Sequence, residues 1–395
     1  MQPGIFPGRQ SVLDRFRPLM ANSRLSQAYL FVGPEGAGKE VTSLEIARLV
    51  NCPRQPHCSA PPFCESCQKA ISFQHPDIRW LGPAPATIST DEVREVLELK
   101  RENPFYQPNF ATTSQVTIGD PDDPGPLTVR TLLRFLRMQP FQGPSKIAIV
   151  ADAHRLTDGA ANAFLKTLEE PPPASLIFLL TSNRSGMLPT IASRCQHVRF
   201  DLYSENELME LLVTMMGIER EKARDIARIT DGNARKAVAL LEPQTVALRK
   251  WAFHLWGWIH AGRSGSALVV ADQLHTGTIP AEMAAAGGEE HLAQARDNPA
   301  KRERAILLCE MLNLYYSEVL SCRERQAEWR PRLVAEQEKV RDLARWRRST
   351  TLLQDIAEVD AAIGDIDHNL NIGLTMAVLF EGLIEHAKRD QAALV

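Results

Sequence analysis

A short loop of glycines that ends in a lysine constrains the fold of this chain more than any other feature. Residues 33–40 read Gly-Pro-Glu-Gly-Ala-Gly-Lys-Glu. In a phosphate-binding loop, G-x-x-x-x-G-K-[ST], glycines let backbone N–H groups point at phosphate oxygens, and the lysine reaches the β and γ phosphates. Residues 28–32 form an apolar run typical of a buried strand, and residues 41–50 have the apolar spacing of a helix. This order of strand, glycine loop and helix favours a genuine P-loop over an unrelated glycine-rich turn.

The residues that would bind Mg²⁺ beside this loop are missing. Glu40 replaces the Ser or Thr hydroxyl, and its carboxylate would repel the phosphates. A second apolar strand, 147–150, leads into Ala151 and Asp152, where related ATPases carry a metal-shell carboxylate and a water-polarising glutamate. Asp152 is about one methylene, ~1.5 Å, shorter than that glutamate. Asp152 alone would be an ordinary polar residue at a strand end, but with Glu40 it indicates a degenerate site that does not use ATP and Mg²⁺. The remaining phosphate-binding candidates are Gly33, Gly36, Gly38 and Lys39.

Four of the seven cysteines are clustered in one short segment: Cys52, Cys58, Cys64 and Cys67. Prolines interrupt the segment, so we expect a loop able to wrap a tetrahedral ion. Only Cys64 and Cys67 have C-x-x-C spacing, and His57 or His75 remains open as a substitute ligand. Disulfides are the alternative, but the odd cysteine count and the lack of a recognisable signal peptide disfavour them. The pattern predicts a structural Zn²⁺ site.

Composition indicates a multidomain globular chain. The 395 residues, 44% apolar and 24% charged, suggest two or three domains. We see no run near the ~18 apolar residues that a membrane span needs, and expect a cytoplasmic protein. A net charge of -3 and a pI near 6.4 argue against a protein that coats DNA by itself, so any DNA contact is expected to be local.

Three motifs between residues 146 and 200 are more specific than the P-loop. They are Asn-Ala-Phe-Leu-Lys-Thr-Leu-Glu-Glu-Pro-Pro at 162–172, Leu-Leu-Thr-Ser-Asn at 179–183 and Ser-Arg-Cys at 193–195. Together they resemble the bacterial clamp-loader branch of the AAA+ ATPases, the family of the delta-prime and gamma/tau subunits of DNA polymerase III. The similarity is strongest to the delta-prime type. It is good over residues 5–85 and 127–243 and weak over the last third of the chain.

The resemblance implies roles for three further residues. Thr181 lies in the sensor-1 region, which reads the γ-phosphate, although a polar cluster at a strand end is an equal alternative. Arg194 takes the arginine-finger position and would act in trans, because its planar donor fork suits phosphoryl charge. A surface ion pair is the alternative for Arg194. Arg235 matches the sensor-2 residue that faces the nucleotide of its own subunit, and could equally be lid surface. The relatives also carry a zinc module after the P-loop helix, where the cysteines lie.

The alternation of strand-like and helix-like segments predicts an α/β P-loop AAA+ domain over residues 1–200, with a parallel sheet and flanking helices. The zinc module would occupy about 52–67. A helical lid is expected over 201–243. An all-α collar domain, through which subunits oligomerise, is expected over 244–395.

Three segments receive separate predictions. Residues 87–127 begin helix-like and end in an acidic Pro/Gly-rich run, so they are interpreted as an insertion with a turn-rich tip. Residues 262–299 are predicted to be a loose linker or short helices. Residues 323–348 carry nine basic and five acidic side chains, which we interpret as a solvated helix face in preference to a contact with DNA or an acidic partner.

These patterns predict a clamp-loader subunit of the delta-prime type that lacks ATPase activity of its own. It would act as a rigid stator within the DNA polymerase III holoenzyme. The implied partners are gamma/tau and delta subunits, the sliding clamp and primed DNA. Two alternatives stay open: an active gamma/tau-type ATPase with an unusual metal arrangement, and a zinc-stapled AAA+ adaptor outside replication.

Overall fold

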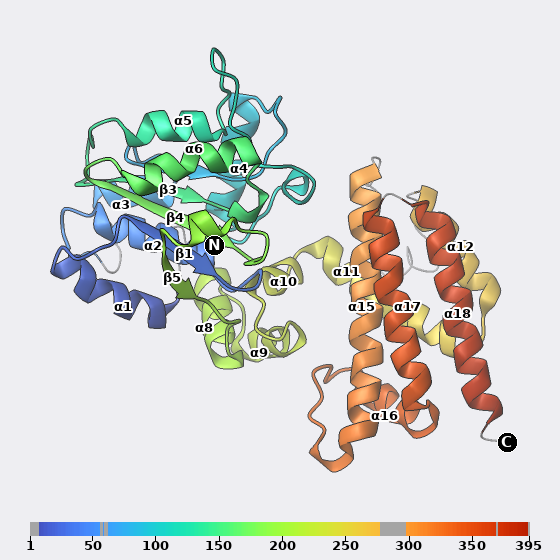
Figure 1. Ribbon diagram of the computed structural model, residues 1–395. Helices are drawn as coiled ribbons and strands as arrows, with labels where there is room; N and C mark the ends of the chain where they lie inside the picture. The colour runs from blue at the N-terminus through green and yellow to red at the C-terminus, as the bar shows by residue number, and fades with distance from the viewer. Residues whose placement is uncertain (1–7, 56–57, 59–61, 277–297, 369, 394–395) are drawn as a thin grey trace. The chain divides into compact units, whose positions relative to one another are not determined.

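Five parallel strands form the centre of the N-terminal part of the chain (Figure 1). They are β1 (Ala28–Val32), β2 (Ile78–Leu81), β3 (Lys146–Val150), β4 (Ser175–Thr181) and β5 (Gln196–Arg199). Their order across the sheet is β2-β3-β4-β1-β5, and each neighbouring pair is parallel. Strands β3 and β4 are buried along their whole length, as expected for a sheet covered on both faces. The predicted α/β fold is confirmed.

The computed structural model describes residues 8–55, 58, 62–276, 298–368 and 370–393. The chain divides into two units, Met1–Val238 and Ala239–Val395. We call them the N-terminal unit and the C-terminal unit.

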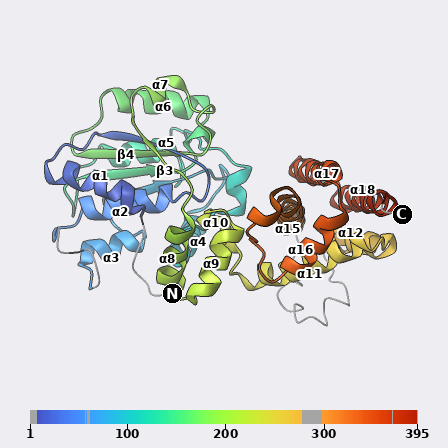
Figure 2. The ribbon, with the colours of Figure 1, turned by 90° about the horizontal axis from the view of Figure 1, so that it is seen from below.

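Helices cover both faces of the sheet. Figure 2 shows α2 (Lys39–Val50) and α3 (Glu65–Ile71) on one side, with α6 (Asp158–Glu169) and α7 (Pro189–Ala192) on the other. The other helices around the sheet are α1 (Gln10–Ala21), α4 (Thr90–Glu102) and α5 (Val129–Leu136). Two short turns are η1 (Asn109–Thr112) and η2 (Ala153–Arg155). Because all strands are parallel, their carboxyl ends meet at one edge, which brings together the residues that follow β1, β3 and β4.

Three helices follow the sheet within residues 201–243, the segment for which a lid is predicted: α8 (Glu205–Met216), α9 (Arg220–Ile229) and α10 (Ala234–Ala239). A capping box between Ser204 and Glu207 starts α8, and Gly217 in the left-handed region ends it. The backbone N–H of Ala234 donates to the carbonyl of Gly36 at 3.1 Å. This bond attaches the start of α10 directly to the glycine loop.

The C-terminal unit contains helices and no strand among its described residues. Its helices are α11 (Pro243–His260), α12 (Ser264–Thr276), α15 (Asn298–Arg325), α16 (Gln337–Trp346), α17 (Ser349–Asp367) and α18 (Ile372–Ala392), with the turn η3 (Gln326–Glu328). Trp251 and Trp256 are buried, and the ring of Trp256 stacks on Tyr315 with centroids 5.1 Å apart. Of the predicted linker 262–299, residues 264–276 form α12, and residues 277–297 lie outside the described residues.

One helix of this unit is more apolar than the sequence analysis allowed. The stretch Arg304–Glu328 is long and apolar enough for a membrane span by length and composition. Half of its apolar window is buried inside the structure. In this unit α15 contacts α11, α16 and α17. The central helix of a helical bundle has the same length and apolar composition.

A buried ionic network joins four helices of the C-terminal unit. Arg347, whose side chain is fully buried, donates to Asp355 of α17, to Asp390 of α18 at 2.9 Å and to Nε2 of His260 in α11 at 2.8 Å. Burial, with the neighbouring Arg347 charge, lowers the pKa of His260 to about 3, so the ring is a neutral acceptor. Asp355 also contacts Nδ1 of His386 at 2.8 Å.

This network corrects the prediction for residues 323–348. They do not form one solvated helix face, because they span the end of α15, the turn η3 and α16. Arg345 follows the prediction, with its side chain 79% exposed. Arg347, two residues later, is enclosed by carboxylates. A charge count along the sequence cannot separate the two.

We expect Arg347→Met to lower the free energy of unfolding by about 3–5 kcal/mol, because it leaves the buried carboxylates of Asp355 and Asp390 without their cation. Urea denaturation of the full chain, followed by the tryptophan fluorescence of this unit, measures the change. The matched control is Arg345→Met, which removes an exposed pair with Asp342 and should cost less than about 0.5 kcal/mol. Equal costs for the two variants would contradict a structural role for the network.

Candidate functional site

The glycine loop connects β1 to α2 at the carboxyl edge of the sheet. Lys39 is the first residue of α2, and its Nζ donates to the carbonyls of Gly33 and Pro34, both at 2.6 Å. Burial lowers the pKa of Lys39 to about 8, against the raising influence of nearby carboxylates, first among them Asp152. The lysine is thus folded back onto its own loop, where it satisfies backbone carbonyls.

Gly36 and Gly38 of this loop lie so close to residues of the segment 201–243 that no larger side chain would fit. Gly36 has φ +71°, and a Cβ there would come within 1.9 Å of Oδ1 of Asn233. Gly38 has φ +81°, and its Cβ would meet the hydroxyl of Tyr203 at 2.0 Å. Any larger residue would therefore be both strained and blocked. The sequence analysis assigned these glycines to phosphate alone and missed Tyr203 and Asn233.

The residues at the metal positions do not fit Mg²⁺. Glu40, in place of the hydroxyl ligand, pairs with Nζ of Lys100 at 2.7 Å. Ala151 offers no ligand. Asp152 begins η2 with φ +46° and accepts from Nε2 of Gln107 at 3.3 Å. The three positions thus provide a carboxylate held by an ammonium, a methyl group and a carboxylate held by an amide, and no open ligand set.

Thr181, the predicted sensor-1 residue, is fully buried at the end of β4. Its hydroxyl donates to the carbonyl of Asn183 at 2.9 Å, accepts from the N–H of Asn183 at 3.1 Å and lies 3.2 Å from Nδ1 of His154. These bonds tie Thr181 into its own turn. The arrangement is the strand-end polar cluster that was the equal alternative for this residue.

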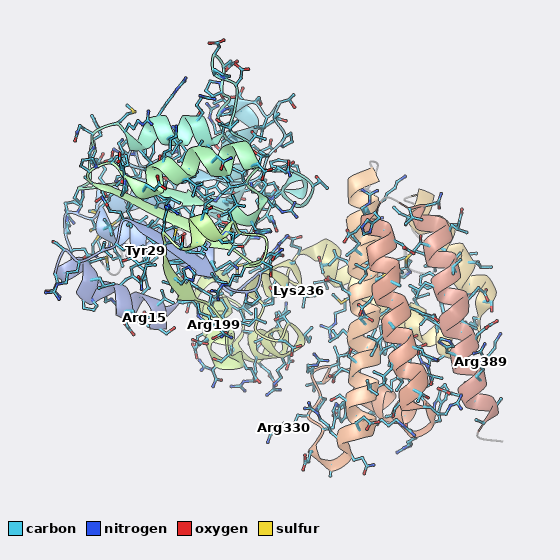
Figure 3. The ribbon with its side chains drawn as sticks, viewed as in Figure 1. Arg15, Tyr29, Arg199, Lys236, Arg330 and Arg389 are labelled. Atoms are coloured by element: carbon cyan, nitrogen blue, oxygen red, sulfur yellow. The ribbon has the colours of Figure 1, made fainter. Side chains whose placement is uncertain are left out.

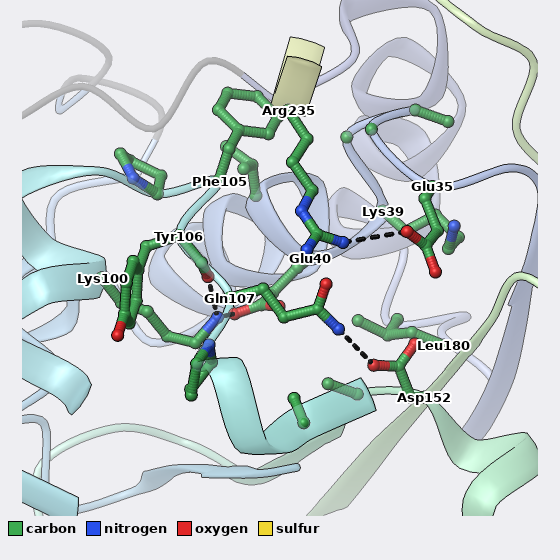
Figure 4. A pocket seen from close by; sticks show the side chains of 18 of the residues that line it. Glu35, Lys39, Glu40, Lys100, Phe105, Tyr106, Gln107, Asp152, Leu180 and Arg235 are labelled. Atoms are coloured by element: carbon green, nitrogen blue, oxygen red, sulfur yellow. Dashed lines mark hydrogen bonds and ion pairs between the residues drawn. The ribbon is translucent and has the colours of Figure 1, made fainter. Parts of the chain in front are cut away.

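Arg235, the predicted sensor-2 residue, lies at the mouth of the pocket formed by the glycine loop (Figure 4). Its Nη1 is 2.9 Å from Oε2 of Glu35, a residue of the loop itself. The side chain is 35% exposed, so the pair is a mobile surface contact worth at most about 1 kcal/mol. Arg235 therefore lines the pocket of its own chain, and the sensor-2 role stays a prediction.

Arg194 lies outside the lining of this pocket, as far as the described residues define it. It follows α7, where Nη1 donates to the carbonyl of Thr190 at 2.8 Å. Nη2 pairs with Oε1 of Glu169, the last residue of α6, at 2.6 Å. The side chain is 35% exposed. The structure thus shows Arg194 in a surface ion pair, and the arginine-finger role stays a prediction.

The four clustered cysteines converge. The Sγ atoms of Cys52, Cys58, Cys64 and Cys67 all lie within 4.8 Å of one another, and the thiols are free and buried. A tetrahedral ion with Zn–S bonds of about 2.3 Å needs sulfurs about 3.8 Å apart. The pair Cys52 and Cys64 is 3.8 Å apart. The residues present fit a soft four-coordinate ion.

Donors around the cluster favour thiolates. Arg48, buried in α2, donates from Nη1 to Sγ of Cys67 at 3.1 Å and to the carbonyl of Cys58 at 2.9 Å. The backbone N–H of Cys64 donates to Sγ of Cys58 at 3.3 Å. Such second contacts orient metal ligands and offset their negative charge.

His75, the candidate histidine that the structure describes, does not join the cysteines. His75 is bound elsewhere, with Nε2 3.0 Å from Oγ of Ser66 and Nδ1 accepting from the N–H of Asp77 at 3.0 Å. His57 lies outside the described residues. Of the described candidates, the four cysteines are the ligand set.

A rigid loop between α5 and β3 presents an apolar surface that the sequence analysis missed. Phe141 is 84% exposed and Met138 is 62% exposed. The buried carboxylate of Asp77 accepts from the N–H groups of Phe141, Gln142 and Gly143 at 2.6 to 2.8 Å. Burial would raise the pKa of Asp77, but these donors and Lys146 lower it to about 2. The loop is therefore held in one shape with its aromatic ring in solvent.

The predicted insertion also contributes to the pocket. Lys100 comes from the last turn of α4, and residues 104–108 follow it along the pocket wall. No local pattern marks Lys100, since its partner Glu40 is sixty residues away. The acidic Pro/Gly-rich end of the segment, by contrast, forms exposed turns without helix or strand.

Comparisons with known proteins agree on one family. The family described as DNA polymerase III, delta subunit, matches residues 8–118 and 127–203, so the break falls on the acidic Pro/Gly-rich turns. The chain is 25% identical over 240 residues to DNA polymerase III subunit tau of Bacillus subtilis, covering 60% of this chain and 36% of that protein. It is 25% identical over 264 residues to subunit delta' of the same organism, covering 66% of this chain and 68% of that protein.

A solved structure extends over more of the chain at lower identity. The gamma subunit-related protein of Thermotoga maritima is 19% identical, covers 95% of this chain and 99% of its own, and has a TM-score of 0.43. The chain spans little more than a third of the length of the tau relative.

Proposed function

We propose that this chain is a clamp-loader subunit of the delta-prime type, in the family of the DNA polymerase III delta-prime and gamma/tau subunits to which it is similar. The observation that carries the proposal is an asymmetry. At the chain's own pocket, Glu40 is held by Lys100 and Ala151 offers no metal ligand. Arg194 lies away from that pocket and is partly exposed. Such a chain would serve a neighbouring ATP site without hydrolysing ATP itself.

Arg194 would act as an arginine finger by leaving Glu169 and binding a phosphoryl group of the neighbouring site. In the single chain its guanidinium is bound to Glu169, with both side chains partly exposed. An exposed pair of this kind is worth about 0–1 kcal/mol. A phosphoryl group in a dry subunit interface attracts the same planar fork far more strongly, and an arginine finger contributes about 10³-fold or more to turnover. Binding of Arg194 to the phosphoryl group is therefore favoured over its pair with Glu169. The hydrogen bond to the carbonyl of Thr190 holds the side chain in place.

We propose that the cysteine cluster binds one structural Zn²⁺. Support comes from the four converging sulfurs and from Arg48, which pairs with Glu45 at 2.6 Å and donates a hydrogen bond to Sγ of Cys67 at 3.1 Å. When bound, Zn²⁺ supplies a rigid tetrahedral node and no chemistry at the nucleotide. Asn51, beside Cys52, bonds both ways to Ser145, at 3.0 and 3.2 Å, in the loop that carries Phe141. The metal would thus stiffen that loop.

The proposed partners are gamma/tau and delta subunits, the sliding clamp and primed DNA, and the proposed location is the cytoplasm. An active gamma/tau-type ATPase is disfavoured because the carboxylate of Glu40 already forms an ion pair with Lys100. An adaptor outside replication would have the same zinc cluster, but is disfavoured by the family match. A reconstituted loader distinguishes all three.

We expect Arg194→Ala to lower the ATPase rate of a loader reconstituted with gamma/tau and delta subunits, while the isolated chain stays inactive in both forms. The loss in total turnover should be partial, because only one of several sites loses its finger, and clamp loading should fall further. Arg194→Lys should rescue poorly, since an ammonium lacks the fork. Steady-state phosphate release and a clamp-loading assay measure the two effects.

The matched control is Arg15→Ala, which removes an exposed arginine of α1 (Figure 3). It should leave both rates unchanged. Wild-type rates in the Arg194→Ala loader would show that Arg194 is ordinary surface.

Protein prepared without chelator should contain one zinc per chain, and Cys64→Ser should lose the metal and lower the melting temperature, because metal binding is coupled to folding of the loop. Elemental analysis and thermal unfolding measure these changes. Cys195→Ser, outside the cluster, should keep the full metal content. Metal-free wild-type protein, or an unchanged melting temperature in Cys64→Ser, would refute the site.

The loop at Phe141 is the proposed contact with the sliding clamp, because a pre-ordered exposed aromatic is typical of binding hot spots. Phe141→Ser should weaken binding of the loader to the clamp by about tenfold or more, with little effect on stability at 84% exposure. Gln139→Ser, at an exposed polar position of the same loop, is the control. Surface plasmon resonance with immobilised clamp measures both, and unchanged affinity in Phe141→Ser would remove this surface from the proposal.

A further inference from the structure

The pair formed by Glu40 and Lys100 lies inside the pocket and is not a surface contact. The side chain of Lys100 is only 3% exposed. Its Nζ lies 2.7 Å from Oε1 of Glu40 and 2.9 Å from the carbonyl of Tyr106, and 4.8 Å from the ring centroid of Trp80. The ammonium is thus surrounded by a carboxylate, a carbonyl and the face of an aromatic ring. The cation is thus fixed beside the position from which the hydroxyl of a working P-loop would hold Mg²⁺.

The segment that follows α4 narrows the same pocket. Pro104, Phe105, Tyr106, Gln107 and Pro108 form the wall opposite the glycine loop (Figure 4). The cavity left between them is about 100 Å³. Phe105, Tyr106 and Gln107 thereby narrow the space beside the pair formed by Glu40 and Lys100.

The charges of the pocket are balanced from within. Its three cations are Lys39, Lys100 and Arg235, and its three carboxylates are Glu35, Glu40 and Asp152. Arg235 pairs with Glu35, Lys100 pairs with Glu40, and Asp152 accepts from Gln107. A nucleotide with its metal would have to break these contacts. A divalent ion near Glu40 would also face the ammonium of Lys100 at close range.

We propose that the ammonium of Lys100 takes the place of the divalent cation and, with residues 104–108, closes this pocket to Mg²⁺-nucleotide. Lys100 is then the residue that determines what the pocket excludes. The closed pocket keeps the glycine loop and the start of α10 in contact without a ligand. The inference rests on the proposed loss of nucleotide use by this chain and adds its physical cause.

The test compares wild type with the double variant Glu40→Thr/Lys100→Met, which restores the hydroxyl and removes the ammonium. Fluorescence anisotropy of a labelled ATP analogue, with Mg²⁺ and with EDTA, measures binding to the full chain. Wild type should not bind the analogue with Mg²⁺, and millimolar Mg²⁺-ATP should not raise its melting temperature. The double variant should bind Mg²⁺-ATP at least about tenfold more tightly than wild type, and EDTA should reverse the gain.

The matched control is Glu205→Thr/Arg228→Met, which removes an exposed ion pair of 2.9 Å between α8 and α9. It should bind no better than wild type. Lys100→Arg, which keeps the cation, should also stay closed. If the double variant does not fold, the wild-type melting temperature alone decides the question.

A rise in the melting temperature of wild type with Mg²⁺-ATP would overturn the inference, as would equal affinity in wild type and the double variant. That outcome is separate from the proposed function. A loader that depends on Arg194 while this chain binds Mg²⁺-ATP would refute the closed pocket and keep the finger. A closed pocket in a loader indifferent to Arg194→Ala would do the reverse.

Discussion

The N-terminal unit depends on a close approach of backbone that only glycine permits. Gly36 and Gly38 have positive φ and leave no room for a Cβ against Asn233 and Tyr203. Through this contact the glycine loop is held between the sheet and the start of α10, with one backbone bond at 3.1 Å. The loop geometry that in working ATPases receives phosphate here also serves as a packing surface. The contact gives the glycine loop a packing role that does not depend on a bound phosphate.

Each of the two units contains a buried cation that is enclosed by carboxylates and other electron-rich groups. Lys100 lies between Glu40, a carbonyl and an indole ring. Arg347 lies among two carboxylates and a neutral imidazole. A buried charge without its partner costs several kcal/mol, so each set fixes the relative position of segments far apart in sequence.

The proposed function divides the molecule into a closed site and two outward-facing surfaces. Charged side chains of the pocket pair with one another, Lys100 with Glu40 and Arg235 with Glu35. Arg194 and Phe141 each lie on a short, well-anchored segment: the first by Thr190 and Glu169, the second by the buried carboxylate of Asp77. The cysteine cluster adjoins the second segment through Asn51. A rigid base under an exposed side chain lowers the entropy cost of binding, which is the physical advantage of a stator.

Local sequence determined the elements and the candidate residues of this protein. Residues 28–32 and 147–150 became β1 and β3 because apolar runs flanked by glycine and polar residues fit buried parallel strands. The glycine spacing marked the loop, and the cysteine density marked the cluster. Tertiary structure alone decided which charges meet. Lys100 reaches Glu40 across sixty residues, and Arg347 is buried two positions from an exposed Arg345 in one basic stretch. Periodicity and composition act over one or two turns of chain, whereas ion pairs across the fold depend on how helices pack, which no local pattern encodes.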